Sequence, residues 1–231
     1  MKCFIGIDAG TSGIKVVVFD ALGRVCGTGY HECDVITPRP GWVEQDPREL
    51  WHACSAAVKM AIGSVGAEIE VGGIGFSGQM QGCLLVDRNL EPIGNCIIWL
   101  DQRSSAQVDE ICGLIADDDA LRLTSNHCLN SFWAPKLLWI RENRPEDYER
   151  AYKVMFVKDY LRLCMTGEVA TEVSDASLSF MLDVGARKWS YPVFDRLGID
   201  RSLVPDTLAE SYEVVGRLSR GLAEEWGIGT G

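Results

Sequence analysis

The chain has 231 residues, of which 47% are hydrophobic and 24% charged, and its formal net charge is -11. This composition is ordinary for a globular protein, and the length suits one large domain or two small ones. Without a basic stripe or a long apolar run, we expect neither a nucleic acid nor a membrane as partner. The nine cysteines are never spaced C-x-x-C, which favours free thiols in a reducing cytoplasm.

Phe4 to Asp20 is the most informative segment and reads FIGIDAGTSGIKVVVFD. An apolar run ends on Asp8, a Gly-Thr-Ser-Gly turn follows, and a β-branched run then leads away. The pattern predicts two strands joined by a short turn. A third strand over 24–33 would complete an antiparallel meander.

The turn between these strands carries groups that could bind a phosphate. Glycines allow a sharp bend and a close approach to a ligand, while two hydroxyls and several N–H groups could surround an anion. Asp8, at the strand end, would face a metal bound to that phosphate. An ordinary hairpin with a polar turn is the alternative, because short Gly-rich signatures also match by chance. The candidate residues in the turn and beside it are Gly10, Thr11, Ser12, Gly13 and Lys15.

A long helix is predicted next. Asp46 suits the N-cap and Pro47 the first helical position, and apolar residues recur at helical spacing as far as Gly63. Beyond it we expect strands over 71–77, 83–86, 96–99 and 154–157, and helices over 104–116, 118–123, 135–143, 159–166 and 222–226.

Two of these strands end in polar residues. Gln79, Met80 and Gln81 lie between two glycines, and Trp99 is followed by Asp101 and Arg103. Strand ends line ligand crevices in α/β sheets, and an aromatic face with carboxylate and amide groups suits a polyhydroxylated ligand. The alternative is a surface turn with a local Asp–Arg ion pair. A further polar cluster, expected near the phosphate turn, comprises Glu172, Ser174, Asp175 and Ser177.

Seven blocks taken in order give the chain a specific resemblance. They are IGIDAGTSGIK, PGWVEQDP, GFSGQMQG, IIWLDQR, APKLLW, KDYLRLCMTGE and SDAS. Together they resemble the N-terminal domain of the FGGY carbohydrate kinases, xylulose kinases in particular. The resemblance implies a ribonuclease H-like α/β domain of the actin-like ATPase superfamily, with a mixed sheet flanked by helices. It also implies ATP-dependent phosphorylation of an open-chain sugar such as D-xylulose.

The resemblance also implies roles for single residues. Asp8 would be the catalytic residue that orients Mg²⁺ and the phosphates of ATP, and the turn residues would bind those phosphates. The sugar would contact Gln79, Met80, Gln81, Asp101 and Arg103.

Three departures from the family pattern lie around the expected sugar site. Gln81 replaces a usual histidine, Leu100 a usual asparagine and Gln102 a usual glycine. These departures leave another ketose, glycerol or a tetritol open as substrate. A non-catalytic module that binds a sugar or a partner protein is the alternative from another class.

In the FGGY carbohydrate kinases, a G-G-G-D block follows a W-G segment that is matched here by Trp226 and Gly227. The Asp of that block is the general base. The chain ends at Gly231, before that block and before the second domain. We therefore expect residues 1–231 to be the N-terminal part of a longer kinase and nearly inactive alone, with the C-terminal kinase domain as partner. An exposed apolar surface for that domain would also favour self-association, for example as a homodimer.

Overall fold

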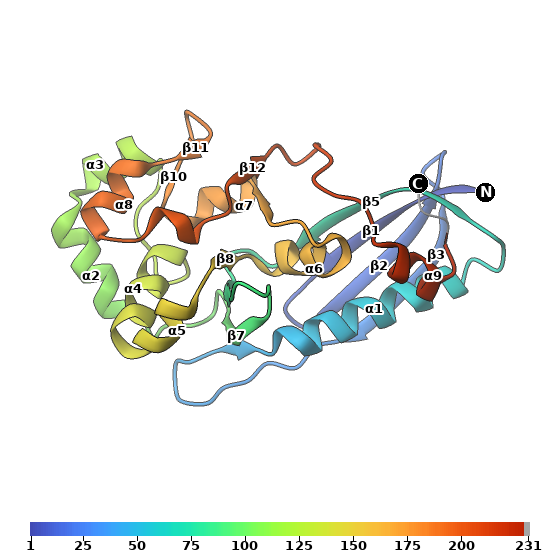
Figure 1. Ribbon diagram of the computed structural model, residues 1–231, viewed down its shortest axis with the longest axis horizontal. Coiled ribbons are helices and arrows are strands. Elements are labelled where there is room, and N and C mark those ends of the chain that lie inside the picture. Colours follow the sequence, from blue (N-terminus) through green and yellow to red (C-terminus); the bar gives the residue numbers. More distant parts are fainter. Residues whose placement is uncertain (229–231) are drawn as a thin grey trace.

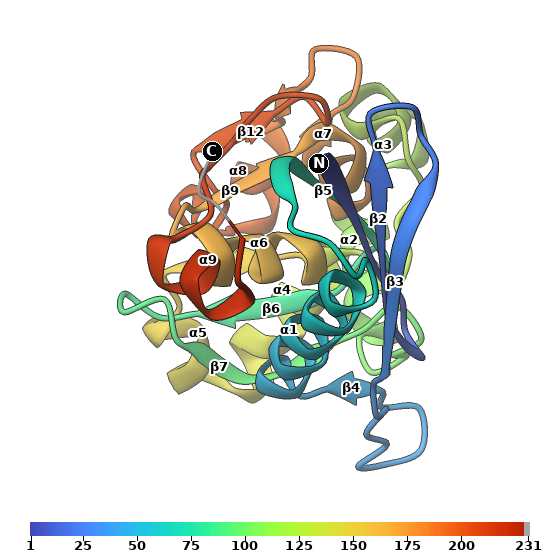
Figure 2. The ribbon, with the colours of Figure 1, turned by 90° about the vertical axis from the view of Figure 1, so that its right-hand side faces the viewer.

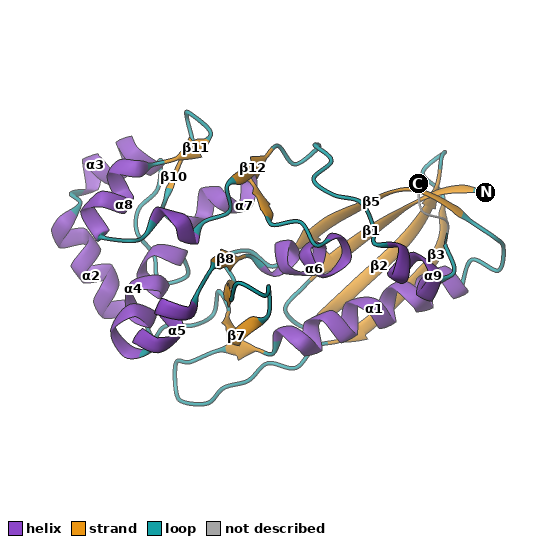
Figure 3. Ribbon diagram, in the orientation of Figure 1, coloured by secondary structure: helices purple, strands orange, loops and turns teal. Residues whose placement is uncertain are grey.

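The computed structural model describes residues 1–228; residues 229–231, which end the expected 1–231 domain, lie outside the described part. Figure 1 shows an elongated molecule with a long sheet at one end and a group of helices at the other. In Figure 3 most helices gather at the end away from that sheet. Among the described residues no helix has the length and apolar character needed to cross a bilayer.

The long sheet contains β1 (Lys2–Ala9), β2 (Gly13–Asp20), β3 (Val25–Glu32) and β5 (Glu70–Gly78), in the order β3-β2-β1-β5. The first three strands form the predicted antiparallel meander, and β5 adds parallel to β1. Ile5 and Ile7 are buried on one face, whereas Phe4 and Asp8 are exposed on the other. The expected mixed sheet is confirmed, and its open face carries Asp8.

Helix α1 (Pro47–Gly63) covers the buried face, with α6 (Val157–Thr166) and α9 (Arg220–Trp226) on the same side (Figure 2). Its start is as predicted, because the Asp46 side chain accepts a hydrogen bond from the Arg48 N–H at 2.8 Å. Gly29 allows the helix to pack directly on β3, since a Cβ at this position would lie 2.0 Å from the Ala57 carbonyl oxygen.

A second sheet lies near the middle of the molecule. It contains β4 (Glu44–Gln45), β7 (Pro92–Ile97), β6 (Cys83–Val86) and β8 (Lys153–Met155), in the order β4-β7-β6-β8, with every pair antiparallel. The strand predicted over 96–99 is therefore displaced toward the N-terminus. A tight turn, in which the Asp101 N–H donates to the Ile98 carbonyl at 3.2 Å, ends the extended segment before Trp99.

The helical end has its own core, in which Trp133 stacks on Phe156 with ring centroids 3.7 Å apart. It contains α2 (Ser105–Leu114), α3 (Asp117–Thr124), α4 (Trp133–Asn143), α5 (Pro145–Arg150) and α8 (Tyr191–Leu197). Helix α5 was not predicted, because it is only six residues long and begins two residues after α4 ends. The remaining elements are α6 (Val157–Thr166), β9 (Ala170–Glu172), α7 (Val173–Ala176), β10 (Leu182–Asp183), β11 (Lys188–Trp189), β12 (Thr207–Ala209) and α9 (Arg220–Trp226), with 3₁₀ turns at Ser177–Ser179 and Arg201–Leu203.

Candidate functional site

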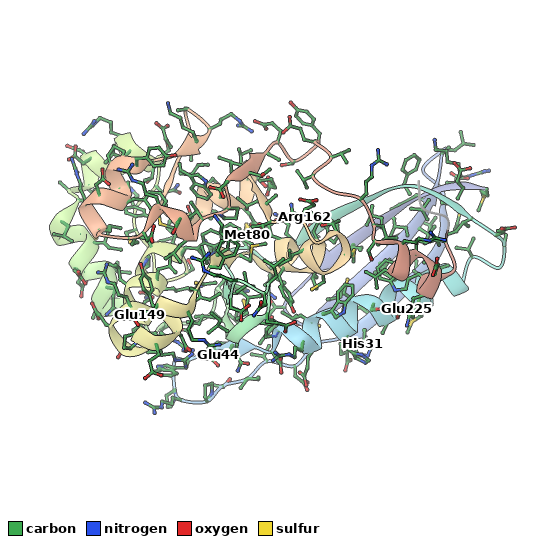
Figure 4. The ribbon with its side chains drawn as sticks, viewed as in Figure 1. His31, Glu44, Met80, Glu149, Arg162 and Glu225 are labelled. Atoms are coloured by element: carbon green, nitrogen blue, oxygen red, sulfur yellow. The ribbon has the colours of Figure 1, made fainter. Side chains whose placement is uncertain are left out.

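A groove of about 790 Å³ lies along the outer edge of β5, facing α6, α7 and the loop over residues 211–218. Met80, just after the end of β5, and Arg162, on α6, both line it. Figure 4 labels these two residues between the long sheet and the helical end. The groove places the end of β5 opposite a set of charged side chains.

The turn predicted to bind phosphate adjoins the end of β1. Asp8 is exposed there and is the cross-strand partner of Lys15, so both side chains lie on the open face of the sheet. In the described part of the chain, the N–H groups of Thr11 and Ser12 have no hydrogen-bond partner. A carboxylate next to unpaired amides is suited to hold a metal–phosphate complex.

Neighbouring β3 fixes the shape of this turn. The Ser12 carbonyl accepts hydrogen bonds from the Cys33 N–H at 3.1 Å and the Tyr30 hydroxyl at 3.2 Å. A Cβ at Gly13 would lie 2.5 Å from the Tyr30 hydroxyl and 2.7 Å from the His31 carbonyl. Only glycine therefore fits at residue 13 in this arrangement.

Side chains from three other segments are bonded to Thr11. Its hydroxyl donates to Gln79 Oε1 at 3.2 Å and accepts from Trp99 Nε1 at 3.0 Å. Its carbonyl accepts from Gln45 Nε2 at 2.9 Å, and Gln45 Oε1 accepts from Gln79 Nε2 at 2.6 Å. Gln79 and Trp99, from the two polar strand ends noted in the sequence, thus meet at the phosphate turn.

Asp101 and Arg103 are buried behind Trp99. The Arg103 guanidinium packs against the rings of Trp42 and Trp139, at 4.1 and 5.0 Å from their centroids, and the two rings also contact each other edge to face. It forms ion pairs with Asp101 at 2.7 Å and with Glu44 at 2.7 Å, and its side chain is 0% exposed. Both side chains of the Asp–Arg pair are thus internal.

Met80, which lines the groove, and Gln81 follow Gln79 in the loop after β5. The Met80 side chain is 53% exposed, and Gln81 has a φ of 66°, a strained value for a residue other than glycine. The ammonium of Lys136 donates to the Gln81 carbonyl at 2.7 Å and to the carbonyls of Ile97 and Ile98 at 3.2 and 3.1 Å. Burial lowers the pKa of Lys136 to about 8.

The wall opposite β5 holds a charged cluster around Lys158. Its ammonium lies 3.2 Å from Asp159, 3.1 Å from Glu172 and 3.0 Å from Asp175. Burial opposes the charge on Lys158, but the three carboxylates raise its pKa above the ordinary value. Burial raises the pKa of Asp175 to about 6, although Lys158 acts in the opposite direction.

The pKa of Glu172 is shifted in the opposite direction from that of Asp175. Burial acts to raise its pKa, but the Lys158 charge and the hydroxyls of Ser211 and Ser174 outweigh that effect and lower the pKa to about 2. Glu172 also caps α7 by accepting from the Ser174 and Asp175 N–H groups. Of the predicted cluster, Glu172, Ser174 and Asp175 line the groove, whereas Ser177 is not among its lining residues.

Sequence reasoning missed four residues of this region. They are Gln45, Lys136, Lys158 and Arg162. All four lay within quoted blocks, so their place in the blocks was a signal, but only contacts between distant segments reveal what they do. Arg162 is 8% exposed, and its Nε has no hydrogen-bond partner in the described residues.

Comparison with known proteins identifies the family. The sequence pattern of the FGGY family of carbohydrate kinases, N-terminal domain, matches residues 3–231. Xylulose kinase from Klebsiella pneumoniae is 37% identical over 227 residues, covering 97% of this chain and 46% of the relative. Glycerol kinase from Thermococcus onnurineus is 30% identical over 231 residues, covering 93% of this chain and 44% of the relative.

A solved structure gives the same result for the fold. The crystal structure of a protein described as a xyloylose kinase from Brucella ovis superimposes with a TM-score of 0.90 at 37% identity, covering 99% of this chain and 47% of that one. The fold is thus that of the actin-like ATPases, as expected from the sequence. The chain spans just under half the length of the curated relatives it matches. It belongs to the FGGY family of carbohydrate kinases and corresponds to their N-terminal domain.

Proposed function

We propose that this chain is the N-terminal domain of a longer kinase that uses ATP to phosphorylate a ketopentose hydroxyl, converting D-xylulose to D-xylulose 5-phosphate. The observation that carries the proposal is the contact of Thr11, in the phosphate turn, with Gln79 and Trp99 at two polar strand ends. Phosphoryl transfer depends mainly on positioning and on charge stabilisation, so phosphate and sugar sites must adjoin. The xylulose kinase relative supports this choice of sugar.

The phosphates of ATP would lie over residues 10–13, with Asp8 as the catalytic and metal-orienting residue. The unpaired amides of the turn and the exposed carboxylate beside it fit a phosphate with its Mg²⁺. The metal would neutralise charge on the transferred group. In this proposal Lys15, the cross-strand partner of Asp8, adds a positive charge on the same face.

The sugar would be held at the end of β5, by Gln79, Met80 and Gln81, with Trp99 beside them. Asp101 and Arg103, whose side chains are buried, would also contribute to this site. Their ion pair fixes the segment that presents Trp99, and the Val43 N–H donates to Asp101 at 2.5 Å in the same network.

The other half of the protein would supply the adenosine pocket and the general base, because the relatives are about twice as long as this chain. A reducing compartment, the cytoplasm, fits the nine cysteines, all of which are free. We further propose self-association as a homodimer, which size-exclusion chromatography with light scattering would test.

Another ketose or a polyol is the second candidate substrate. Leu100, 41% exposed beside Trp99, gives the expected sugar site an apolar side chain at its rim. The glycerol kinase relative supports a polyol.

The test is ADP release by the full-length protein with ATP and Mg²⁺ across D-xylulose, other ketoses, glycerol and tetritols. Selective turnover of D-xylulose would support the proposal, and selective turnover of another member would move the substrate. Absence of sugar-stimulated ADP release across the panel would refute the kinase activity and favour a binding module.

A further inference from the structure

Gln45 joins the phosphate turn to the sugar-side loop. The side chain is 0% exposed and comes from β4, a two-residue strand that belongs to neither segment. Its amide nitrogen donates to the Thr11 carbonyl at 2.9 Å and to the Asp34 carbonyl at 3.3 Å. Its amide oxygen accepts from Gln79 at 2.6 Å. Both ends of one buried amide are therefore used to hold two different loops.

The contact between Thr11 and Gln79 closes this set of bonds into a ring. The Thr11 hydroxyl donates to Gln79 Oε1, so each of the three residues is bonded to the other two. In such a ring an amide cannot rotate without breaking at least one buried hydrogen bond, and an unpaired buried polar group is costly. The conformations of residues 10–13 and 78–82 are thereby made interdependent.

We propose that Gln45 is a positioning residue that couples occupancy of the sugar-side loop to the shape of the phosphate turn. A ligand that fixes Gln79 through the adjoining Met80 and Gln81 would also fix Thr11, and a phosphate bound at the turn would in the same way order the sugar side. Coupling of this kind is reciprocal, so each ligand should raise the affinity for the other by the same factor. This inference rests on the proposed function for the identity of the two ligands, but not for the coupling itself.

Two backbone amides report the two sides of the ring. The Gln79 N–H donates to the Ala9 carbonyl at 2.8 Å, and the Cys33 N–H donates to the Ser12 carbonyl at 3.1 Å. Hydrogen exchange at these amides measures how often each side opens. Gln79→Leu is best followed at the Cys33 amide, on the side that it does not touch, whereas Gln45→Leu removes a partner of both sides.

The experiment measures exchange at both amides by NMR in the purified protein carrying Gln45→Leu or Gln79→Leu. We expect Gln45→Leu to speed exchange at the Gln79 amide, and Gln79→Leu to speed exchange at the Cys33 amide, each about tenfold. The matched control is Gln107→Leu, which removes a buried amide that is bonded to Glu142 at 2.6 Å away from the ring. It should alter neither amide.

The inference would be overturned if each variant sped up amide exchange only in the segment that carries the substitution. It would also be overturned if Gln107→Leu sped up exchange at these amides to the same extent. A second measurement uses the full-length protein and compares the affinity for Mg·ATP with and without D-xylulose. We expect the sugar to tighten nucleotide binding about fivefold or more in the unmodified protein and less than about twofold in Gln45→Leu. If the full-length protein has no sugar-stimulated activity, the proposed function fails, and the exchange data alone decide whether the ring couples the two loops.

Discussion

Replacement of Asp175 by asparagine is the perturbation that best tests the charged wall of the groove. Asp175 is 5% exposed, and its carboxylate lies 3.0 Å from the Lys158 ammonium. Burial raises the pKa of this carboxyl from 3.8 to about 6. Asparagine has nearly the same shape but stays neutral at every pH, so it removes the titration together with the charge that pairs with Lys158.

The direction in which stability changes with pH follows from proton binding by Asp175. Because the folded-state pKa of Asp175 is the higher one, the folded protein holds a proton that the unfolded chain releases between pH 3.8 and about 6. Stability is therefore lost as the pH rises through this window. A shift of roughly two units corresponds to about 3 kcal/mol in total, of which about 2 kcal/mol is lost between pH 4.5 and 7.

The assay is urea unfolding of both proteins at several pH values from about 4.5 to 7, a range above the lowered pKa of about 2 at Glu172. The free energy of unfolding of the unmodified protein should fall relative to Asp175→Asn by about 2 kcal/mol across this range. Asp109→Asn, at an exposed position on α2, is the matched control and should keep the unmodified pH profile. A constant difference between the unmodified protein and Asp175→Asn at all pH values would refute the reasoning.

Three further results are expected. Arg103→Met should lower the free energy of unfolding by about 3–5 kcal/mol in urea melts, because the buried Asp101 carboxylate loses its ion-pair partner and Glu44 keeps only Arg144 at 3.5 Å. A loss below about 1 kcal/mol would contradict that account. Gly29→Ala should lower the free energy of unfolding by about 1–3 kcal/mol, because the added Cβ would meet the backbone of α1. The control Gly63→Ala, whose Cβ would have nothing within 4 Å, should be tolerated. Equal shifts of the melting temperature for the two variants would count against the close packing at Gly29. The 231-residue chain alone should release ADP in the presence of sugar about 10²–10⁴-fold more slowly than the full-length protein, and comparable turnover would show that general-base help from another domain is not needed.

Local sequence signals predicted much of the fold. The strands around the Gly-Thr-Ser-Gly turn and the helix beginning at Pro47 are confirmed as β1, β2 and α1, because hairpin turns and N-caps are formed by residues close in sequence. The family blocks predicted the fold class, which the structural comparison bears out. The boundary error at Trp99 arose because a turn there ends the strand although the residues remain apolar.

The roles of the strand-end residues were harder to infer. Asp101 and Arg103 were predicted to contact the sugar, and that role stays a prediction. The packing of Arg103 against Trp42 and Trp139 could not be read from the sequence, because the two rings lie 97 residues apart along the chain and meet only in the fold.

The sequence by itself determined which residue types stand at the turn, at the strand ends and at the start of α1, since short-range backbone preferences and hydrophobic periodicity govern these features. Only the tertiary structure decided which of these residues meet. Thr11, Gln45 and Gln79 come from three separate segments, and Lys158 gathers carboxylates from α6, β9 and α7. Buried polar groups must find partners wherever the packed elements bring them, and that arrangement is set by the packing of the whole core.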